Sequence, residues 1–346
     1  MKVSLFDYEL PADRIAQAPR ERGSSRLLVL DRRSGEVSHR RFSDLPSLLR
    51  PGDVLVRNDV RVRNARLWGR DPEGRLTEIF LLEAESGDRA RWQALARPGR
   101  RARPGRRLDF ADGLSATIVS VSADGRRDVL FDRAVEDAYL ERFGSVPLPP
   151  YIRRPAGGPD LDEDRAAYQT VFARQPLAVA APTAGLHFTD AVLAEIAARG
   201  VEIADLTLAV GPGTFKPVTS DDTESHAMDT ERVWIPFSTR RAVGRASSSG
   251  ARVVAVGTTV ARSLEAAART SDDADGVLEF STDLFITPGF DFQAIDALLT
   301  NFHLPASTLL MLVCAFAGRD RVLAAYEEAI RQGYLFYSYG DAMWIA

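Results

Sequence analysis

One stretch near the middle of the chain constrains the fold most, because its apolar pattern changes from strand to helix and back. Residues 177–180 form a short apolar run typical of a buried strand. Apolar residues then recur with helical spacing after Thr189 or Asp190, either of which could cap the helix, and Gly200 marks its end. A second apolar run begins at Val201. This order predicts two parallel strands joined by a helix, so the loop between them should lie at a strand end, where open α/β sheets bind ligands.

Length and composition set the number of domains and exclude several protein classes. The chain has 346 residues, of which 45% are hydrophobic and 27% charged, so we expect about two globular domains. A net charge of −4 gives no overall sign of nucleic-acid binding, so any such surface must be local. The single cysteine, Cys314, lies in an apolar run that favours a buried thiol. The sequence shows neither a secretion signal nor an apolar run long enough to span a membrane, which predicts a cytoplasmic protein.

Residues 60–146 differ in pattern from the rest of the chain. Short strand-like runs alternate there with glycine or Pro-Gly turns, as in a small antiparallel barrel or sandwich. The expected strands are residues 66–70, 77–84, 91–96, 114–121 and 128–131. Helices and strands alternate again farther along, so the expected fold class is α/β. We expect an α/β domain of residues 1–59 and 147–346, with a β-barrel of residues 60–146 inserted into it.

Three loops rich in glycine and threonine follow three apolar strands. Glycine lets backbone N–H groups approach a ligand closely, and a threonine hydroxyl at a helix start can cap the helix or bind a ligand. One such loop would more often be a turn or a cap, but three at equivalent strand ends predict a shared crevice for a small molecule. The expected ligand-binding residues are Thr183, Gly185, Gly211, Gly213, Thr214, Gly257, Thr258 and Thr259, with Asn301 and Asp341 from two later loops.

Histidine is scarce, and three of the four histidines occur beside such loops. His187 lies in the first loop, His226 follows the second, and His303 lies in a later Thr-Asn-Phe-His segment. Imidazole suits proton transfer near neutral pH, so these three are the candidate catalytic residues, with His187 ranked first. A purely structural imidazole is the alternative for each. No pair has the helical spacing of zinc ligands, so no metal site is expected, and His39 is expected at the surface.

An arginine-rich segment interrupts the predicted barrel. In an acidic protein such a cluster is typical of a surface that contacts nucleic-acid phosphates, although a solvated turn is the alternative. The candidate phosphate-contacting residues are Arg97, Arg100, Arg101, Arg103, Arg106 and Arg107.

Five motifs occur along the chain in an order that resembles one known enzyme family. They are residues 181–188 (APTAGLHF), 210–218 (VGPGTFKPV), 256–259 (VGTT), 300–305 (TNFHLP) and 339–343 (YGDAM). Further matches are residues 6–11 (FDYELP), 25–28 (SRLL), 51–53 (PGD) and 147–152 (PLPPYI). Together they resemble the S-adenosylmethionine:tRNA ribosyltransferase-isomerases of queuosine synthesis, nearly from end to end.

The resemblance implies a substrate, an acceptor and a set of products. The ribosyl part of S-adenosylmethionine would be transferred and isomerised onto 7-aminomethyl-7-deazaguanine at the wobble position of a tRNA anticodon. The products would be epoxyqueuosine-tRNA, adenine and methionine. S-adenosylmethionine is then a substrate, and no cofactor or metal is expected. A β-barrel inserted into an α/β domain is also implied, and we expect a monomer that binds no membrane.

The implied reaction needs groups that move protons. The sulfonium of S-adenosylmethionine acidifies the adjacent C5′ proton, so a base could remove it and expel adenine. The tRNA amine would then attack C1′, and closure of the epoxide would release methionine. Asp7 and Asp341 are weaker options than the three histidines.

Three positions depart from the family pattern. Ala209 and Asp229 stand where the family commonly has histidines, and Val260 replaces a serine while Arg262 is kept. Asp229 could still handle a proton, whereas Ala209 could not.

Two other functions fit parts of the pattern. A phosphoribosyl-type transferase would use the Gly/Thr loops as phosphate cradles, but its acidic pair should lead into such a loop. The pairs Asp221-Asp222 and Asp272-Asp273 lie elsewhere. A non-enzymatic RNA-binding barrel would leave the three histidine-bearing loops without a purpose. An effect of S-adenosylmethionine on thermal stability would separate these hypotheses.

Overall fold

The computed structural model describes residues 1–85, 87–155, 162–211, 213, 218–270 and 276–346. By its internal contacts the chain divides into two compact units, which are Met1–Arg61 with Ala167–Ala346, and Val62–Ala166. The limits expected from sequence, 60–146 for the barrel, differ from this division mainly at the second boundary, and they stay a prediction.

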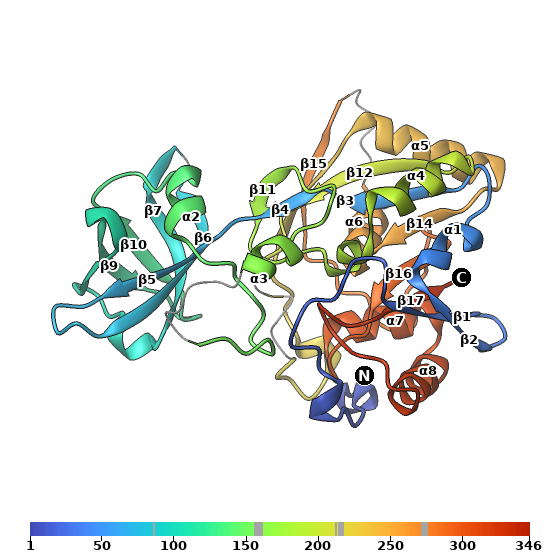
Figure 1. The fold of residues 1–346 in the computed structure, drawn as a ribbon, viewed down its shortest axis with the longest axis horizontal. Coiled ribbons are helices and arrows are strands. Elements are labelled where there is room, and N and C mark those ends of the chain that lie inside the picture. Colours follow the sequence, from blue (N-terminus) through green and yellow to red (C-terminus); the bar gives the residue numbers. More distant parts are fainter. Residues whose placement is uncertain (86, 156–161, 212, 214–217, 271–275) are drawn as a thin grey trace. The chain divides into compact units, whose positions relative to one another are not determined.

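A mixed β-sheet organises the first unit. Nine described strands lie in the order β15-β13-β12-β3-β14-β16-β17-β1-β2 (Figure 1). Their bounds are β1 Arg26–Leu30, β2 Val37–Arg41, β3 Val54–Asn58, β12 Glu202–Leu208, β13 Glu231–Ile235, β14 Val253–Val256, β15 Leu278–Thr282, β16 Ala297–Asn301 and β17 Ala342–Ile345. The four neighbours β12, β3, β14 and β16 are parallel, whereas β13, β15 and β2 pair antiparallel with their neighbours. The carboxyl ends of the four parallel strands therefore meet at one edge of the sheet.

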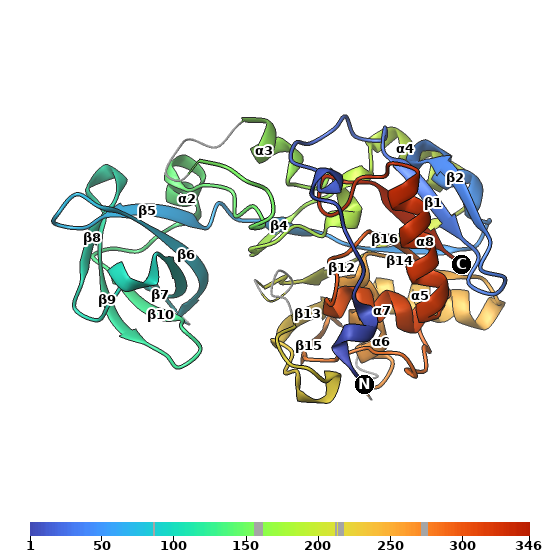
Figure 2. The same ribbon diagram turned by 90° about the horizontal axis from the view of Figure 1, so that it is seen from below.

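Helices cover both faces of this sheet. The helices of the first unit are α1 Leu45–Leu48, α4 Asp190–Ala198, α5 Phe237–Ser249, α6 Thr258–Ala267, α7 Thr308–Ala317 and α8 Arg319–Arg331. Leu55, Val254 and Leu299 of three central strands share one buried cluster with Ile196 of α4 and Leu45 of α1. Helix α6 contacts β3, β12 and β14, and Figure 2 shows α4 and α6 on opposite sides of the sheet. Every residue of β3, β14 and β16 is buried, as expected for strands covered on both faces.

The second unit contains the barrel. Six strands close into it in the order β10-β7-β6-β5-β8-β9, with antiparallel pairing throughout. Their bounds are β5 Arg66–Arg70, β6 Leu76–Glu85, β7 Asp88–Arg97, β8 Arg107–Asp109, β9 Ser115–Val121 and β10 Arg127–Phe131. The helices α2 Asp137–Phe143 and α3 Asp162–Ala167 follow. The predicted fold class, α/β with a small antiparallel barrel, is confirmed.

The prediction that the first strand of the βαβ unit lies in the same sheet as the second is wrong. Strand β11 (Gln175–Ala178) does not join the nine-stranded sheet but pairs with β4 (Val60–Val62) in a separate two-stranded sheet. Three of its four residues are exposed, and Pro176 has no N–H to donate, both of which suit an edge strand rather than a central one. The rest of the pattern is confirmed, since Thr189 caps α4 by accepting a hydrogen bond from the Val192 N–H and β12 follows.

Two smaller differences between the predicted and the observed elements concern one helix and one strand. The sequence pattern predicts a helix over residues 162–172, whereas α3 ends at Ala167. Strand β8 was not expected, because its three residues begin at the last arginine of the arginine-rich segment. In the described part of the chain, no helix combines the length and apolar character needed to cross a membrane.

Candidate active site

His187 closes a short 3₁₀ helix, η6 (Thr183–His187), and is almost completely buried. Its Nδ1 lies 2.9 Å from Ser25 Oγ, and its Nε2 lies 3.0 Å from Asn301 Nδ2. The Asn301 amide also donates to the Tyr337 carbonyl at 3.1 Å, which identifies Nδ2 as the NH₂ group. His187 Nε2 therefore accepts a hydrogen bond, and the Nδ1–H donates to Ser25.

Burial keeps the His187 imidazole neutral. It lowers the pKa of His187 from 6.5 to about 4, and the nearby cations Arg22 and Arg20 lower it further in the same direction. Arg22 also donates to the Leu186 carbonyl at 3.1 Å, which fixes the preceding residue of η6. With both ring nitrogens engaged, His187 could take up a proton at Nε2 only after its bond from Asn301 opens.

Asn301 is the last residue of β16, and its side chain contacts both His187 and the Tyr337 carbonyl. Its Oδ1 is buried and has no hydrogen-bond partner among the described residues. Its other contact, Tyr337, has a φ of 72°, in the left-handed region that residues other than glycine rarely adopt. An unsatisfied buried oxygen beside a strained backbone is a feature that structures retain mainly at functional sites.

His303 lies in a second buried network. Its Nε2 is 2.8 Å from Thr300 Oγ1, its backbone N–H donates to the Tyr326 hydroxyl at 3.1 Å, and its carbonyl accepts from the Tyr8 hydroxyl. Burial lowers the pKa of His303 to about 3, so this imidazole is also neutral at pH 7.

Asp341 is completely buried and its carboxylate is already occupied. Oδ1 accepts from the Arg26 N–H at 2.8 Å and pairs with Arg20 at 3.1 Å, and Oδ2 accepts from the Leu335 N–H at 2.8 Å. These contacts hold the turn that precedes β17. The geometry gives Asp341 a structural task, and its predicted role in binding substrate stays a prediction.

A small cavity of about 70 Å³ lies near the carboxyl ends of β12 and β14. Its lining residues are Gly213, His226, Ala227, Met228, Asp229, Glu231, Arg262, Thr308 and Leu309. A narrower hollow shares Met228, Arg262, Thr308 and Leu309 with it and adds Thr258 and Thr259 from the start of α6. His226 is half-buried and meets the ring of Phe285 edge-on at 5.3 Å. Of the three predicted catalytic histidines, only His226 lines this cavity.

An ion pair between Glu231 and Arg262 forms one wall of the cavity. Both side chains are buried, and Glu231 Oε1 also accepts from the Gly211 N–H at 2.9 Å. Burial lowers the pKa of Arg262 to about 10, while the charge of Asp283 acts in the opposite direction. The Arg262 Nε is buried without a hydrogen-bond partner in the described part of the structure. The pair thus links the second loop to α6, which the third loop begins.

The structure brings most of the three predicted loops together. Gly257 has a φ of 94°, and a Cβ built on it would lie 3.6 Å from the Cβ of Ala184, so the first and third loops are in contact. A Cβ on Gly185 would lie 2.8 Å from atoms of Phe172 and Thr170, so this glycine permits close packing rather than facing the cavity.

Further positions in and beside these loops differ in where the structure places them. Thr183 begins η6 and is half-buried, whereas Thr214 lies outside the described residues. Asp229 lies close to the second loop, because a Cβ on Gly213 would come within 2.5 Å of its Oδ2. Asp229 therefore lies beside Gly213 and lines the cavity. Ala209 only continues the pairing with β13, through its N–H to the Arg232 carbonyl at 3.0 Å.

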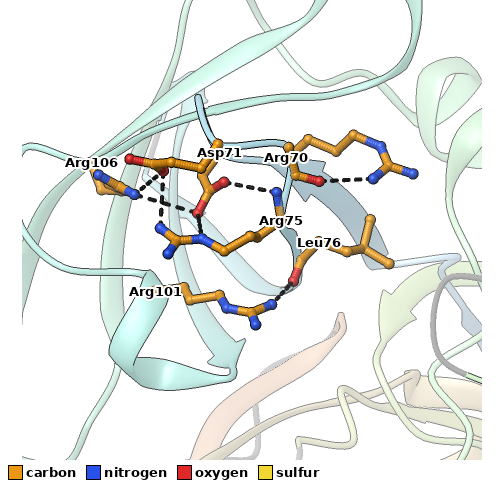
Figure 3. A network of polar contacts seen from close by, with 8 residues as sticks. Arg70, Asp71, Arg75, Leu76, Arg101 and Arg106 are labelled. Atoms are coloured by element: carbon orange, nitrogen blue, oxygen red, sulfur yellow. Dashed lines mark hydrogen bonds and ion pairs between the residues drawn. The ribbon is translucent and has the colours of Figure 1, made fainter.

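The six candidate phosphate-contacting arginines lie in the second unit. Four of them, Arg100, Arg101, Arg103 and Arg106, line one open concavity together with Arg75. Arg97 and Arg107 are not part of its lining. Figure 3 shows Arg106 in contact with Asp71 and Arg101 in contact with the Leu76 carbonyl.

Several residues of these sites were not singled out from the sequence as site residues. Ser25 and Glu231 look like ordinary polar residues, because their partners His187 and Arg262 are distant in the chain. The retained arginine of the third-loop motif was the one available signal for Arg262. Asp71 carried no signal, since acidic residues are common in turns.

Comparisons with known proteins decide the family. A family model described as queuosine biosynthesis protein matches residues 3–345. The chain belongs to this family. The S-adenosylmethionine:tRNA ribosyltransferase-isomerase of Anaeromyxobacter dehalogenans strain 2CP-C is 50% identical over 347 residues, which cover 99% of each chain. That of Heliobacterium modesticaldum is 49% identical over 348 residues and covers 100% of both.

A solved structure agrees with this assignment. The crystal structure of S-adenosylmethionine tRNA ribosyltransferase from Thermotoga maritima matches with a TM-score of 0.56 and 37% identity, over 99% of this chain and 100% of that one. The resemblance seen in the sequence motifs is confirmed, and the chain is an enzyme of the queuosine biosynthesis family.

Proposed function

We propose that this enzyme transfers and isomerises the ribosyl part of S-adenosylmethionine onto 7-aminomethyl-7-deazaguanine in a tRNA anticodon. The products would be epoxyqueuosine-tRNA, adenine and methionine. The observation that carries the proposal is the identity of about half the residues, over the full length, to proteins named for this activity. S-adenosylmethionine serves as substrate, no cofactor is proposed, and we propose that the enzyme works as a cytoplasmic monomer.

The cavity at the ends of β12 and β14 suits the amino-acid end of S-adenosylmethionine. That end carries a carboxylate and an ammonium group. The cavity offers a buried guanidinium, Arg262, for the first and two carboxylates, Asp229 and Glu231, for the second. Thr258 and Thr259 at the start of α6 extend the polar lining. The ribosyl part would then project from the cavity toward the tRNA base.

We assign proton transfer to residues whose side chains line this cavity. His226 lines it, so we propose that His226 handles the C5′ proton and the departing adenine. His187 and His303 stay candidates, but each would have to leave a buried hydrogen bond first. In their present positions they orient Asn301 and Thr300 of β16.

The test is product formation with the purified protein. We expect adenine and methionine to be released when S-adenosylmethionine is mixed with tRNA that carries 7-aminomethyl-7-deazaguanine. Unmodified tRNA is the matched control and should give no adenine. Failure to release adenine with the modified tRNA would overturn the proposal.

Histidine variants then assign the roles. His226→Gln should lower kcat by at least about 100-fold, because general acid/base groups contribute on that order. His39→Gln, at a histidine on β2 that lines neither cavity, is the matched control and should keep full turnover. Equal rates for the His226 variant and wild type would remove His226 from the mechanism.

A further inference from the structure

An open, arginine-lined concavity lies in the second unit, outside the candidate active site. It has a volume of about 600 Å³ and is lined by Arg75, Arg100, Arg101, Arg103, Pro104, Gly105 and Arg106. We call this surface the arginine concavity. Its residues come from the turn between β5 and β6 and from the segment between β7 and β8.

One buried carboxylate holds two of these arginines in place. Asp71 accepts from the Arg75 backbone N–H and from Arg75 Nε, both at 2.8 Å, and from Arg106 Nη2 at 3.4 Å (Figure 3). Burial acts to raise the pKa of Asp71, but the hydrogen bonds from Arg75 outweigh it and lower the pKa to about 2. Glu73, which is half-exposed, bridges the same two arginines from outside. Arg75 and Arg106 are thus fixed before any ligand arrives.

The other arginines keep their positive charge available. Arg101 donates to the Leu76 carbonyl at 2.8 Å, a contact that orients the guanidinium without neutralising it. Arg100 and Arg103 are exposed, and neither has an ion-pair partner among the described residues. Five guanidinium groups against the two carboxylates Asp71 and Glu73 leave three positive charges at the arginine concavity.

We propose that the arginine concavity binds backbone phosphates of the substrate tRNA and that Asp71 is the positioning residue of this site. An excess of guanidinium groups in an open concavity, two of them held in place by Asp71, matches phosphodiester oxygens, which arginine binds through two parallel N–H donors. The site adds Arg75 to the residues expected from sequence and leaves out Arg97 and Arg107. The identity of the RNA rests on the proposed function, whereas the phosphate chemistry rests on the arginines alone.

The sign of one substitution separates positioning from simple charge. Asp71→Asn and Glu73→Gln each remove one negative charge. If charge alone mattered, both variants would bind tRNA more tightly. Because Asp71 holds Arg75 and Arg106, we expect Asp71→Asn to weaken binding on the order of threefold or more, while Glu73→Gln binds as tightly as wild type or tighter. Tighter binding by the Asp71 variant would contradict its positioning role.

A second experiment does not depend on a buried residue. Arg100→Gln with Arg103→Gln should weaken tRNA binding on the order of tenfold at low salt and reduce the slope of log Kd against log salt by about 1.5 to 2, because two phosphate contacts are lost. Arg133→Gln, an exposed arginine of the same unit paired with Asp112, is the matched control and should leave the slope unchanged. An unchanged slope in the double variant would show that the arginine concavity is a solvated surface that does not bind phosphates.

Measuring binding and turnover on the same samples keeps the two proposals distinguishable. Weakened tRNA binding by the double variant, with no adenine released by wild type, would support the phosphate site and overturn the proposed function. Active wild type with unchanged KM for tRNA in the double variant would support the proposed function and overturn the phosphate site.

Discussion

At the scale of single residues, the two buried histidines are held by hydrogen bonds that sequence patterns do not reveal. Ser25 and Asn301, which contact His187, are 162 and 114 residues away from it in the chain. A histidine in a loop therefore looks reactive in the sequence, whereas in the fold burial keeps the His187 imidazole neutral and both of its ring nitrogens are hydrogen-bonded. His226, ranked behind it, is the histidine that lines the cavity.

The neutral state of His187 predicts how stability depends on pH. The imidazole titrates near pH 6.5 in the unfolded chain and at about 4 in the folded protein, so between these values the unfolded state binds more protons. Acidification from pH 7 to 4 should therefore remove up to about 3 kcal/mol of stability through this group. Urea denaturation should show a smaller loss between pH 7 and 4.5 for His187→Gln than for wild type. Parallel losses in the two proteins would contradict the neutral imidazole.

Substitutions of the Glu231–Arg262 pair should affect the stability of the fold and the binding of S-adenosylmethionine differently. Glu231→Gln leaves a buried guanidinium unpaired, which should cost on the order of 3–5 kcal/mol of stability. Adding Arg262→Met removes the unpaired charge and should recover much of the loss, because a buried neutral glutamine costs far less than a buried unpaired guanidinium. The double variant should still fail to bind S-adenosylmethionine, measured as a lost rise of the melting temperature. Normal binding by the double variant would exclude this cavity as the substrate site.

At the scale of elements, local patterns predicted what local interactions determine. The Thr189 cap, the turn glycines and the strands β5 to β7 follow from spacing and turn residues, and they are present in the structure. The pairing of β11 does not, because the choice between a central strand and an edge strand depends on partners elsewhere in the chain. Pro176 was the one local signal for the edge position.

The turn before β17 offers a test at this scale. A Cβ on Gly340 would lie 2.4 Å from the Leu335 carbonyl oxygen, a backbone atom that cannot move aside alone. Gly340→Ala should therefore lower stability by about 1–3 kcal/mol. Gly244→Ala is the matched control, since a Cβ there meets open space within α5, and it should raise stability by about 0.5–1 kcal/mol. Thermal unfolding of both variants measures the difference, and equal midpoints would show that the turn tolerates a side chain.

At the scale of the whole molecule, the sequence predicted the α/β fold class with a barrel, whereas the first loop follows β11, which lies outside the nine-stranded sheet. The sequence could not predict which loop residues face the cavity, because that depends on ion pairs such as Glu231–Arg262 between distant segments. Nor could it separate Arg97 and Arg107 from the arginines that line the concavity, since a run of like charges carries no information on direction.

The central claim is that the ribosyl part of S-adenosylmethionine becomes part of the tRNA. S-adenosylmethionine labelled with ¹⁴C in its ribose tests this most directly, in a single turnover with tRNA that carries 7-aminomethyl-7-deazaguanine. We predict that the label enters the tRNA in equal amount to the adenine released, and that digestion places it in one modified nucleoside. Adenine release without label in the tRNA would contradict the claim.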